Sequence, residues 1–359
     1  MLLMFLATPR AVSPDRIVLA AGGGDRESGP ATVCRLKLPF ACGMDRNGTL
    51  FVAEMAGRVL AIDRGGDIRR IAGAEAEGDS GDGGPALDAR VRSPHHLLVL
   101  PNGDLLVADT MNHRIRRIDA RTGTIEPFAG TGDAGFSGDG GPAIRARFGS
   151  IYCLALDSAR SALFVDDLDN RRIRRIDMKT GVVTTVAGNG ARGVPTEGAE
   201  ATAAPLQDPR AITWDPSGRL YILERDGNAL RVVDERGKIH TVVGTGHPGP
   251  ASDGDAAAST LRGPKHLAVE PNGNVLIADT DNHVIRRYIV GSRRVVTVAG
   301  TGTPGQGAAG EPALEAALNL PHGVYVDRGG TIYICDSGNG RVIRIEKGRA
   351  GRTSGKTGQ

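Results

Sequence analysis

The chain has 359 residues with a formal net charge of +3 at pH 7, and 24% of its residues are charged. This small positive excess excludes the strongly basic class of dedicated nucleic-acid-binding proteins. The 52 glycines and 20 prolines indicate many turns, and the lack of a long helical period or low-complexity block favours a β-rich fold.

Residues 1–15 are expected to lie outside the folded domain. Met1–Ala7 is apolar, but it lacks a leading positive charge and is too short for a secretory core or a membrane span. We expect a disordered segment or the remnant of a signal shortened by a misplaced start codon, and no other stretch is a transmembrane candidate. The sequence therefore leaves the location open between cytoplasmic and, if the signal is truncated, secreted or periplasmic.

From residue 16 onward, one pattern of four strands recurs along the chain. An inner strand, such as PHHLLVL from Pro94, is followed by the turn PNGD and by the hairpin LLVADTMNHRIRRID at Leu105–Asp119. An outer strand such as IEPFAGTG, ending at Gly132, and a glycine-rich link complete the unit. Runs such as Leu105–Ala108 are apolar throughout, as expected for strands that pack on both faces.

The acidic residue that follows each apolar hairpin strand measures the length of the repeat. Successive acids are separated by 55 to 58 residues, and this regular period predicts a β-propeller with one four-stranded blade per repeat. The six acids are Glu54, Asp109, Asp167, Glu224, Asp279 and Asp336.

The last hairpin ends at Glu346 and has no outer strand of its own, whereas Arg16–Asp25, RIVLAAGGGD, resembles the outer strands of the other repeats. We therefore expect the N-terminal strand to complete the last blade, which removes the open sheet edge of a linear array. Residues 16–348 are predicted to form one all-β, six-bladed β-propeller of four-stranded antiparallel blades. We expect a monomer, with residues 349–359 as a disordered tail.

Polar residues that recur in several repeats are interpreted as scaffold. Asp109 precedes an asparagine by three residues, a spacing that suits a carboxylate bonded to the turn's backbone donors and paired with a following arginine. The arginines of the outer hairpin strands are expected to keep their charged heads in water. The link acids Asp82 and Asp139 are too few for a calcium site.

The four cysteines are Cys34, Cys42, Cys153 and Cys335, and their spacing is not typical of a metal site. Buried free thiols are the expected state. A Cys34–Cys42 disulfide is the alternative, so the redox environment stays undecided.

Histidines and basic residues are concentrated at the two positions that follow the proline, or its equivalent, at the start of each predicted inner strand. These positions surround one mouth of the central channel in a propeller. Neutral imidazoles that converge there would suit zinc. A cationic rim would instead attract a carboxylate, a phosphate or an acidic loop of a partner, and a solvated rim without a ligand is the third interpretation. The predicted rim consists of His95, His96, Tyr152, Arg210, Lys265, His266 and His322.

The hairpins VADTMNHRIRRID and IADTDNHVIRRY, the outer strand TVAGTG and the link SGDGGPA resemble NHL repeats, in the bacterial style, over roughly residues 16–348. The resemblance implies a six-bladed propeller. Propellers of this kind serve as protein or RNA platforms, as sensor domains and, in relatives, as metal-dependent enzymes, so the fold does not imply one activity.

Two related propeller enzymes imply possible metals. The lyase that amidates peptidyl hydroxyglycines is a similar propeller that binds zinc through histidines at inner-strand starts, and the matching positions are His95, His266 and His322. These lie in blades two, five and six, a less even spacing than in that lyase. The gluconolactonase-like propellers use inward carboxylate and amide ligands, which the predicted rim lacks.

Our hypothesis from the sequence is a binding platform whose protein partner or small anionic ligand meets the predicted rim. The alternative is a zinc- or calcium-dependent lyase or hydrolase that uses the same mouth, so the sequence leaves open whether the protein is an enzyme. Nucleic acid is not expected as a partner, because the chain has only 1 Trp, 5 Tyr and 7 Phe to stack on bases near its arginine clusters.

Overall fold

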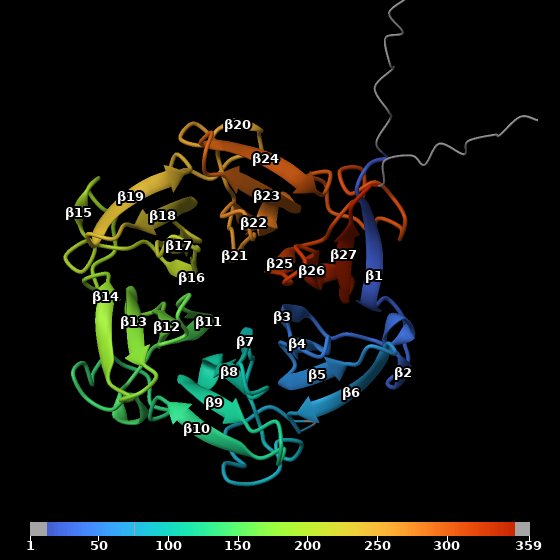
Figure 1. Cartoon of the computed structure of the whole chain (residues 1–359), viewed down its shortest axis with the longest axis horizontal. Coiled ribbons are helices and arrows are strands. Elements are labelled where there is room, and N and C mark those ends of the chain that lie inside the picture. Colours follow the sequence, from blue (N-terminus) through green and yellow to red (C-terminus); the bar gives the residue numbers. More distant parts are fainter. Residues whose placement is uncertain (1–12, 75, 349–359) are drawn as a thin grey trace, which may run out of the picture.

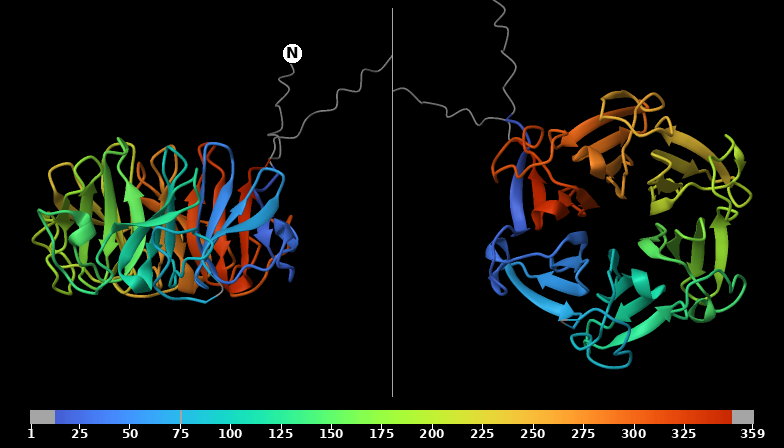
Figure 2. Two further views of the ribbon diagram at one scale, coloured as in Figure 1. Left: turned by 90° about the horizontal axis from the view of Figure 1, so that it is seen from below. Right: turned by 180° about the vertical axis from the view of Figure 1, so that it is seen from behind.

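Six antiparallel sheets stand radially around a central axis in the computed structural model, which describes residues 13–74 and 76–348 (Figure 1). In the side view the blades form a disc, with strands running roughly along the axis (Figure 2). The predicted six-bladed, all-β propeller is therefore confirmed. The expectations for residues 1–12 and for the tail at residues 349–359 fall outside the described residues.

The blades are numbered in chain order, and the strands of each blade are given from the inner strand to the outer strand. Blades one to three contain β3 (Pro39–Met44), β4 (Leu50–Glu54), β5 (Arg58–Ile62) and β6 (Asp67–Ala72); β7 (His96–Val99), β8 (Leu105–Asp109), β9 (Arg114–Ile118) and β10 (Ile125–Ala129); and β11 (Ile151–Leu156), β12 (Ala162–Asp167), β13 (Arg172–Asp177) and β14 (Val183–Ala187). Blades four to six contain β16 (Pro209–Trp214), β17 (Leu220–Glu224), β18 (Ala229–Val233) and β19 (Lys238–Val243); β21 (His266–Val269), β22 (Val275–Asp279), β23 (Val284–Ile289) and β24 (Arg294–Ala299); and β25 (Pro321–Val326), β26 (Ile332–Asp336), β27 (Arg341–Glu346) and β1 (Arg16–Gly22).

Short elements lie at the edges of the blades. Two-residue strands add a fifth strand to blades one, four and five, beyond the four that the repeat predicts: β2 (Gly29–Pro30), β15 (Ala199–Glu200) and β20 (Gly254–Asp255). The 3-10 turns are η1 (Ala31–Val33), η2 (Thr110–Asn112), η3 (Ala143–Arg145), η4 (Thr280–Asn282) and η5 (Ser337–Asn339). Among the described residues, no helical segment reaches the length and apolarity that crossing a bilayer requires.

The N-terminal strand closes the ring as predicted. β1 pairs antiparallel with β27, and its register places Ile17 opposite Ile345 and Leu19 opposite Ile343. The two strands lie side by side at the outer edge of blade six (Figure 1). The first and last parts of the chain are thus held in one sheet, and this sheet edge is covered.

The hydrophobic core lies between neighbouring blades. β8 and β22 are buried along their whole length, which confirms that these strands pack on both faces. Leu106 of blade two and Leu163 of blade three belong to one cluster, for example. The clusters hold each blade at a fixed orientation around the channel.

The arginines of the outer hairpin strands are not all solvated, which corrects the prediction. Arg116, Arg174 and Arg286 are fully buried. Their guanidinium groups reach the link acids Asp82, Asp139 and Asp253. The link acids therefore neutralise buried cations, because an unpaired charge in such a place would be costly.

The repeat acids are scaffold, although their backbone donors are not those expected. Asp109 accepts hydrogen bonds from Asn112 Nδ2 and from the Arg92 amide, which lies in the preceding link rather than in the turn. Arg116 Nη1 lies 3.6 Å from the other oxygen. Burial raises the pKa of Asp109 to about 6, and these partners oppose that rise. The acid thus ties the link to the hairpin.

All four cysteines are free and buried, so the alternative of a Cys34–Cys42 disulfide is wrong.

Candidate binding site in the central channel

The first residues of the inner strands form a packed ring of side chains, which we call the first layer. Phe40 stacks on His322 with ring centroids 4.2 Å apart and contacts His95 at 4.7 Å. The His95 ring meets Tyr152 edge-on at 4.4 Å, and the Arg210 guanidinium lies 3.8 Å above the Tyr152 ring. Five blades thus contribute to one continuous stack.

The charge of the first layer comes from two residues. Burial lowers the pKa of His95 well below its usual value, and Arg210 lowers it further. Burial, followed by the charge of Lys265, lowers the pKa of His322 to about 3. Both histidines are therefore neutral at pH 7. Lys265 pairs with Asp281 at 3.2 Å, which leaves Arg210 as the cation of this layer without an ion pair among the described residues.

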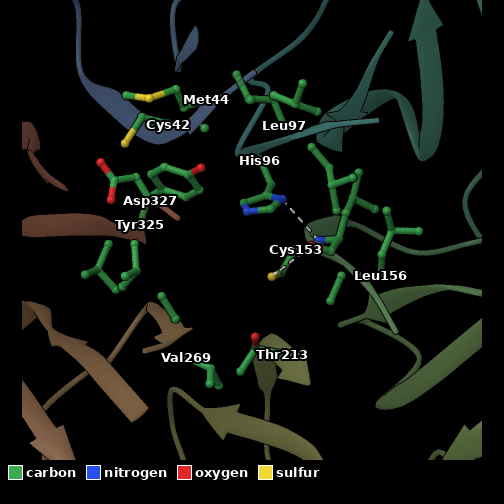
Figure 3. A pocket seen from close by; sticks show the side chains of 18 of the residues that line it. Cys42, Met44, His96, Leu97, Cys153, Leu156, Thr213, Val269, Tyr325 and Asp327 are labelled. Atoms are coloured by element: carbon green, nitrogen blue, oxygen red, sulfur yellow. Dashed lines mark hydrogen bonds between the residues drawn. The ribbon is translucent and has the colours of Figure 1, made fainter. Parts of the chain in front are cut away.

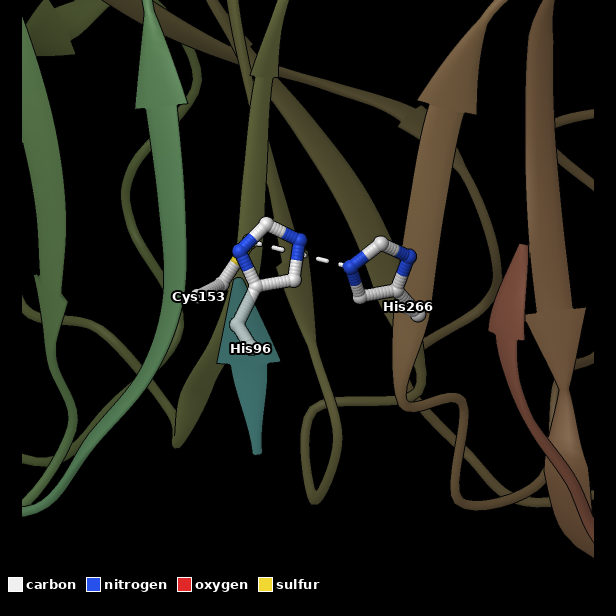
Figure 4. Close-up of side chains that lie close together, drawn as sticks. All are labelled: His96, Cys153 and His266. Atoms are coloured by element: carbon white, nitrogen blue, oxygen red, sulfur yellow. Dashed lines mark hydrogen bonds between the residues drawn. The ribbon is translucent and has the colours of Figure 1, made fainter. Parts of the chain in front are cut away.

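A second layer follows one residue further along the inner strands. His96, Cys153 and His266 each present a possible ligand atom, and these atoms all lie within 4.8 Å of one another (Figure 4). Cys153 Sγ lies 4.0 Å from His266 Nε2, and the two imidazole centroids are 4.9 Å apart. The equivalent positions in the other three blades carry the small residues Ala41, Ala211 and Gly323.

Burial keeps the side chains of the second layer uncharged, and backbone amides donate hydrogen bonds to two of them. The Leu154 amide donates to His96 Nδ1 at 3.2 Å, and the Ile212 amide donates to Cys153 Sγ at 3.4 Å. Burial lowers the pKa of His96 well below its usual value and that of His266 to about 4. Burial also raises the pKa of Cys153 to about 12, so two neutral imidazoles and a thiol face one another at pH 7.

The structure groups different residues from those implied for zinc. Of His95, His266 and His322, only His266 belongs to the described group of possible metal ligands, because the other two lie in the first layer. Cys153 was interpreted as a structural thiol. The signal for its inclusion was its position directly after the first-layer residue Tyr152, which matches the position of His96 after His95.

Asp166 is a buried acid that the sequence analysis missed. One of its oxygens accepts hydrogen bonds from the amides of Tyr152 and Cys153, at 2.8 and 2.6 Å. The other oxygen has no hydrogen-bond partner among the described residues. Burial raises the pKa of Asp166 well above its usual value, and Arg210 opposes this rise. The available signal was a departure from the repeat, because Ala108 and Ala278 occupy the equivalent positions.

Beyond the second layer, the channel widens into a cavity of about 370 Å³ that extends to the ends of the inner strands. His96, Cys153 and His266 line the end of the cavity next to the second layer, which we call its floor. Leu97, Leu156 and Val269 are among the apolar residues of its wall (Figure 3). The volume lies in the range typical of sites for small molecules. Of the predicted rim, His96 and His266 line this cavity, whereas the other five residues lie in the first layer.

Three arginines stand at the outer end of this cavity. Arg46, Arg160 and Arg328 come from the turns that follow the inner strands of blades one, three and six, and all three are exposed. Within the described chain, none of them forms an ion pair. Asp45 and Asp327 lie beside two of them, but each bonds to amides of its own turn. The arginine heads are therefore free for an incoming group.

These features define a six-bladed β-propeller with a ligand-sized cavity in its channel. Residues 143–301 match the family model of the teneurin NHL domain, and residues 318–345 match the model of the NHL repeat. Both matches, together with the six-bladed fold, confirm the resemblance to NHL repeats that the motifs predicted.

Two curated relatives show how far the similarity extends. Protein SUPPRESSOR OF QUENCHING 1, chloroplastic, from Arabidopsis thaliana is 25% identical over 328 residues, which is 87% of this chain and 31% of that protein. Teneurin-1 from Gallus gallus is 30% identical over 220 residues, or 55% of this chain and 8% of the relative. The chain thus spans less than a third of these relatives.

Solved structures share the fold at low sequence identity. An auxiliary nutrient binding protein from Bacteroides ovatus has a TM-score of 0.68 at 18% identity, with 93% of this chain and 76% of that chain covered. A streptogramin B lyase has a TM-score of 0.54 at 15% identity, with 92% and 98% covered. At these identities the likeness establishes the fold alone.

Proposed function

We propose that this propeller binds a small, partly apolar anionic ligand in its central channel. The observation that carries the proposal is the cavity of about 370 Å³ with three arginines at its outer end that have no ion pair among the described residues. Guanidinium groups suit carboxylates and phosphates because they donate several hydrogen bonds in a fixed plane. Three such groups around a concave opening also raise the local concentration of anions.

The cavity itself favours a ligand with an apolar part. Its walls contain Leu97, Val99, Leu156 and Val269. The side chains of these residues offer an apolar contact surface and no hydrogen-bonding groups. Its floor is uncharged at pH 7, because the two imidazoles and the thiol are neutral. A ligand with an anionic head at the arginines and an apolar body inside the channel matches this distribution. The nutrient-binding protein with the same fold supports a binding role by analogy.

The proposal is tested with a panel of small carboxylates and phosphates, scored by the rise in melting temperature and by calorimetric titration. The triple variant Arg46→Gln, Arg160→Gln, Arg328→Gln should bind any positive compound at least about tenfold more weakly, because each lost charge-assisted hydrogen bond contributes more than a neutral one. The matched control changes Arg64, Arg121 and Arg236 to Gln. These arginines are exposed in turns between the third and fourth strands, so this control should bind as the unchanged protein does.

The predicted rim provides the competing location at the other end of the channel. Arg210 is buried there, and its Nε has no hydrogen-bond partner among the described residues. Loss of binding in Arg210→Gln together with full binding in the triple variant would move the site to the first layer. If no compound of the panel raises the melting temperature, the proposal of an anionic ligand is wrong.

A further inference from the structure

We propose that His96, Cys153 and His266 bind one zinc-like transition-metal ion at the floor of the channel cavity. The inference goes beyond the proposed function, since it assigns a metal site that does not require the anionic ligand. Two imidazoles and one thiol form the described group, and this donor set suits zinc, cobalt and copper rather than calcium or magnesium.

The distances allow coordination after a small movement. The three ligand atoms lie within 4.8 Å of one another, whereas ligand atoms around a zinc ion at 2.0–2.3 Å lie about 3.3–3.8 Å apart. A contraction of about 1 Å is needed, and rotation of the two histidine side chains into the cavity can supply it. The wall opposite does not obstruct this movement, because Ala41, Ala211 and Gly323 occupy the other positions of the layer.

The hydrogen bonds around the group prepare two of the three ligands. The Val324 carbonyl lies 3.2 Å from His266 Nδ1, nearer than the Val324 amide at 3.5 Å, so Nδ1 donates its proton to the carbonyl and the Nε2 lone pair faces Cys153. The Ile212 amide already donates to Cys153 Sγ, which stabilises the thiolate that a metal requires. The thiol proton leaves to solvent as the metal–sulfur bond forms. Sulfur donates the electron pair, and no redox step is involved.

His96 is the ligand that must exchange a partner. Its Nδ1 accepts the Leu154 amide, and in the neutral ring Nε2 therefore carries the proton. Coordination through Nδ1 replaces this hydrogen bond and leaves the Nε2 proton in place. Three protein ligands on the floor leave the fourth position open toward the cavity, as in zinc sites that accept a water or a ligand oxygen.

The experiment uses the full chain, stripped of metal and titrated with Zn²⁺ and Co²⁺. Elemental analysis should find one equivalent of bound metal. The Co²⁺ form should show a thiolate-to-cobalt charge-transfer band in the near ultraviolet. In Cys153→Ser this band should disappear, and in His266→Gln the affinity for Zn²⁺ should fall at least about tenfold, because one of three ligands is lost.

The matched control is Cys42→Ser, since Cys42 is a buried thiol that lines the same cavity but lies outside the described ligand group. It should keep both the stoichiometry and the charge-transfer band. The Arg46, Arg160, Arg328 triple variant should also bind the metal normally, which separates this result from that of the anion test. Absence of stoichiometric metal in the unchanged protein, or equal uptake by Cys153→Ser and His266→Gln, would overturn the proposal.

Discussion

Arg174 occupies a fully buried position on the third strand of blade three, where the sequence pattern predicted a solvated head. Its guanidinium lies 2.7 Å from Asp139 and 3.3 Å from Asp167, and it also donates to the Ser137 carbonyl. Neighbouring side chains on a strand point to opposite faces, so Arg174 and Arg175 differ in their surroundings. The sequence does not show which face the preceding link covers, and this is why the prediction failed.

Replacement of Arg174 should therefore destabilise the folded protein. We expect Arg174→Met to lower the free energy of unfolding by about 3–5 kcal/mol, because Asp167 would remain buried without its cation. Arg175→Met is the matched control. Arg175 is a third exposed, and its one ion pair among the described residues is with Asp177, so its loss should cost less than about 1 kcal/mol. Urea unfolding of the three proteins measures the difference, and equal costs would contradict the assigned role.

His95 should make the stability of the protein depend on pH. Burial first, and then mainly the charge of Arg210, lower the pKa of His95 in the folded state, against the opposing hydrogen bond to the Ser93 carbonyl; Arg225 and, when protonated, His322 also face the ring and lower the pKa. Because the unfolded chain then binds more protons below pH 6.5, this contribution to stability is complete above pH 6.5 and is lost as the pH falls. The variant His95→Phe keeps the ring stack but removes the titration.

Between pH 6.5 and 5, the free energy of unfolding of His95→Phe should fall less steeply than that of the unchanged protein, by up to about 1.4 kcal/mol per pH unit. Urea unfolding at several pH values gives both slopes. His247→Gln, which changes an exposed histidine, is the control and should leave the slope unchanged. Identical slopes in all three proteins would show that His95 is not kept neutral by the fold.

At the scale of the element, the inner strands decide how much of the site the sequence can predict. The repeat correctly indicated which positions surround the channel. It did not indicate that they separate into two layers. In β11 the pairing with β12 shifts between Ile151 and Leu154, and similar shifts occur at the starts of β3, β16 and β25. Such a bulge removes the strict alternation, so Tyr152 and Cys153 both contribute to the channel.

Residues that differ from their equivalents in the other blades indicate parts of the site that the common repeat pattern does not show. Asp166 stands on β12 where the other blades have apolar residues, and Cys153 stands where a histidine occurs in two blades. Neither was part of the predicted site, because a cysteine in an apolar strand is usually a structural thiol and Asp166 adjoins a repeat acid, Asp167, that serves as scaffold. Their proximity depends on packing between blades, which no local spacing encodes.

At the scale of the whole molecule, the period of the acids and the missing last strand were sufficient to predict the closed ring. The outer end of the cavity was not predictable, because its arginines lie in turns that differ from blade to blade. The pairing of β1 with β27 also has a mechanical consequence. Blade one cannot separate from blade six unless β1 leaves the sheet, since a short segment joins β1 to blade one.

A circular permutant tests whether β1 holds blades one and six together. The register places Arg16 opposite Glu346, so an Asn-Gly turn can join Glu346 to Arg16 and convert β27 and β1 into a hairpin. The permuted chain begins at residue 23, runs to Glu346 and ends with residues 16–22. Every strand pair is kept, but among the described residues blades one and six are then joined only by contacts that involve side chains, such as the stacking of Phe40 on His322 and the hydrogen bond from Ser337 Oγ to the Pro39 carbonyl.

We expect the permutant to give the same circular dichroism spectrum but to unfold in urea about tenfold faster or more, because separation of blades one and six no longer requires β1 to leave its sheet. The control is the unpermuted chain of residues 16–346, which contains the same residues as the permutant apart from the Asn-Gly turn. Equal unfolding rates would mean that packing between blades alone limits the opening of the ring. The role of β1 would then be confined to covering the edge of β27.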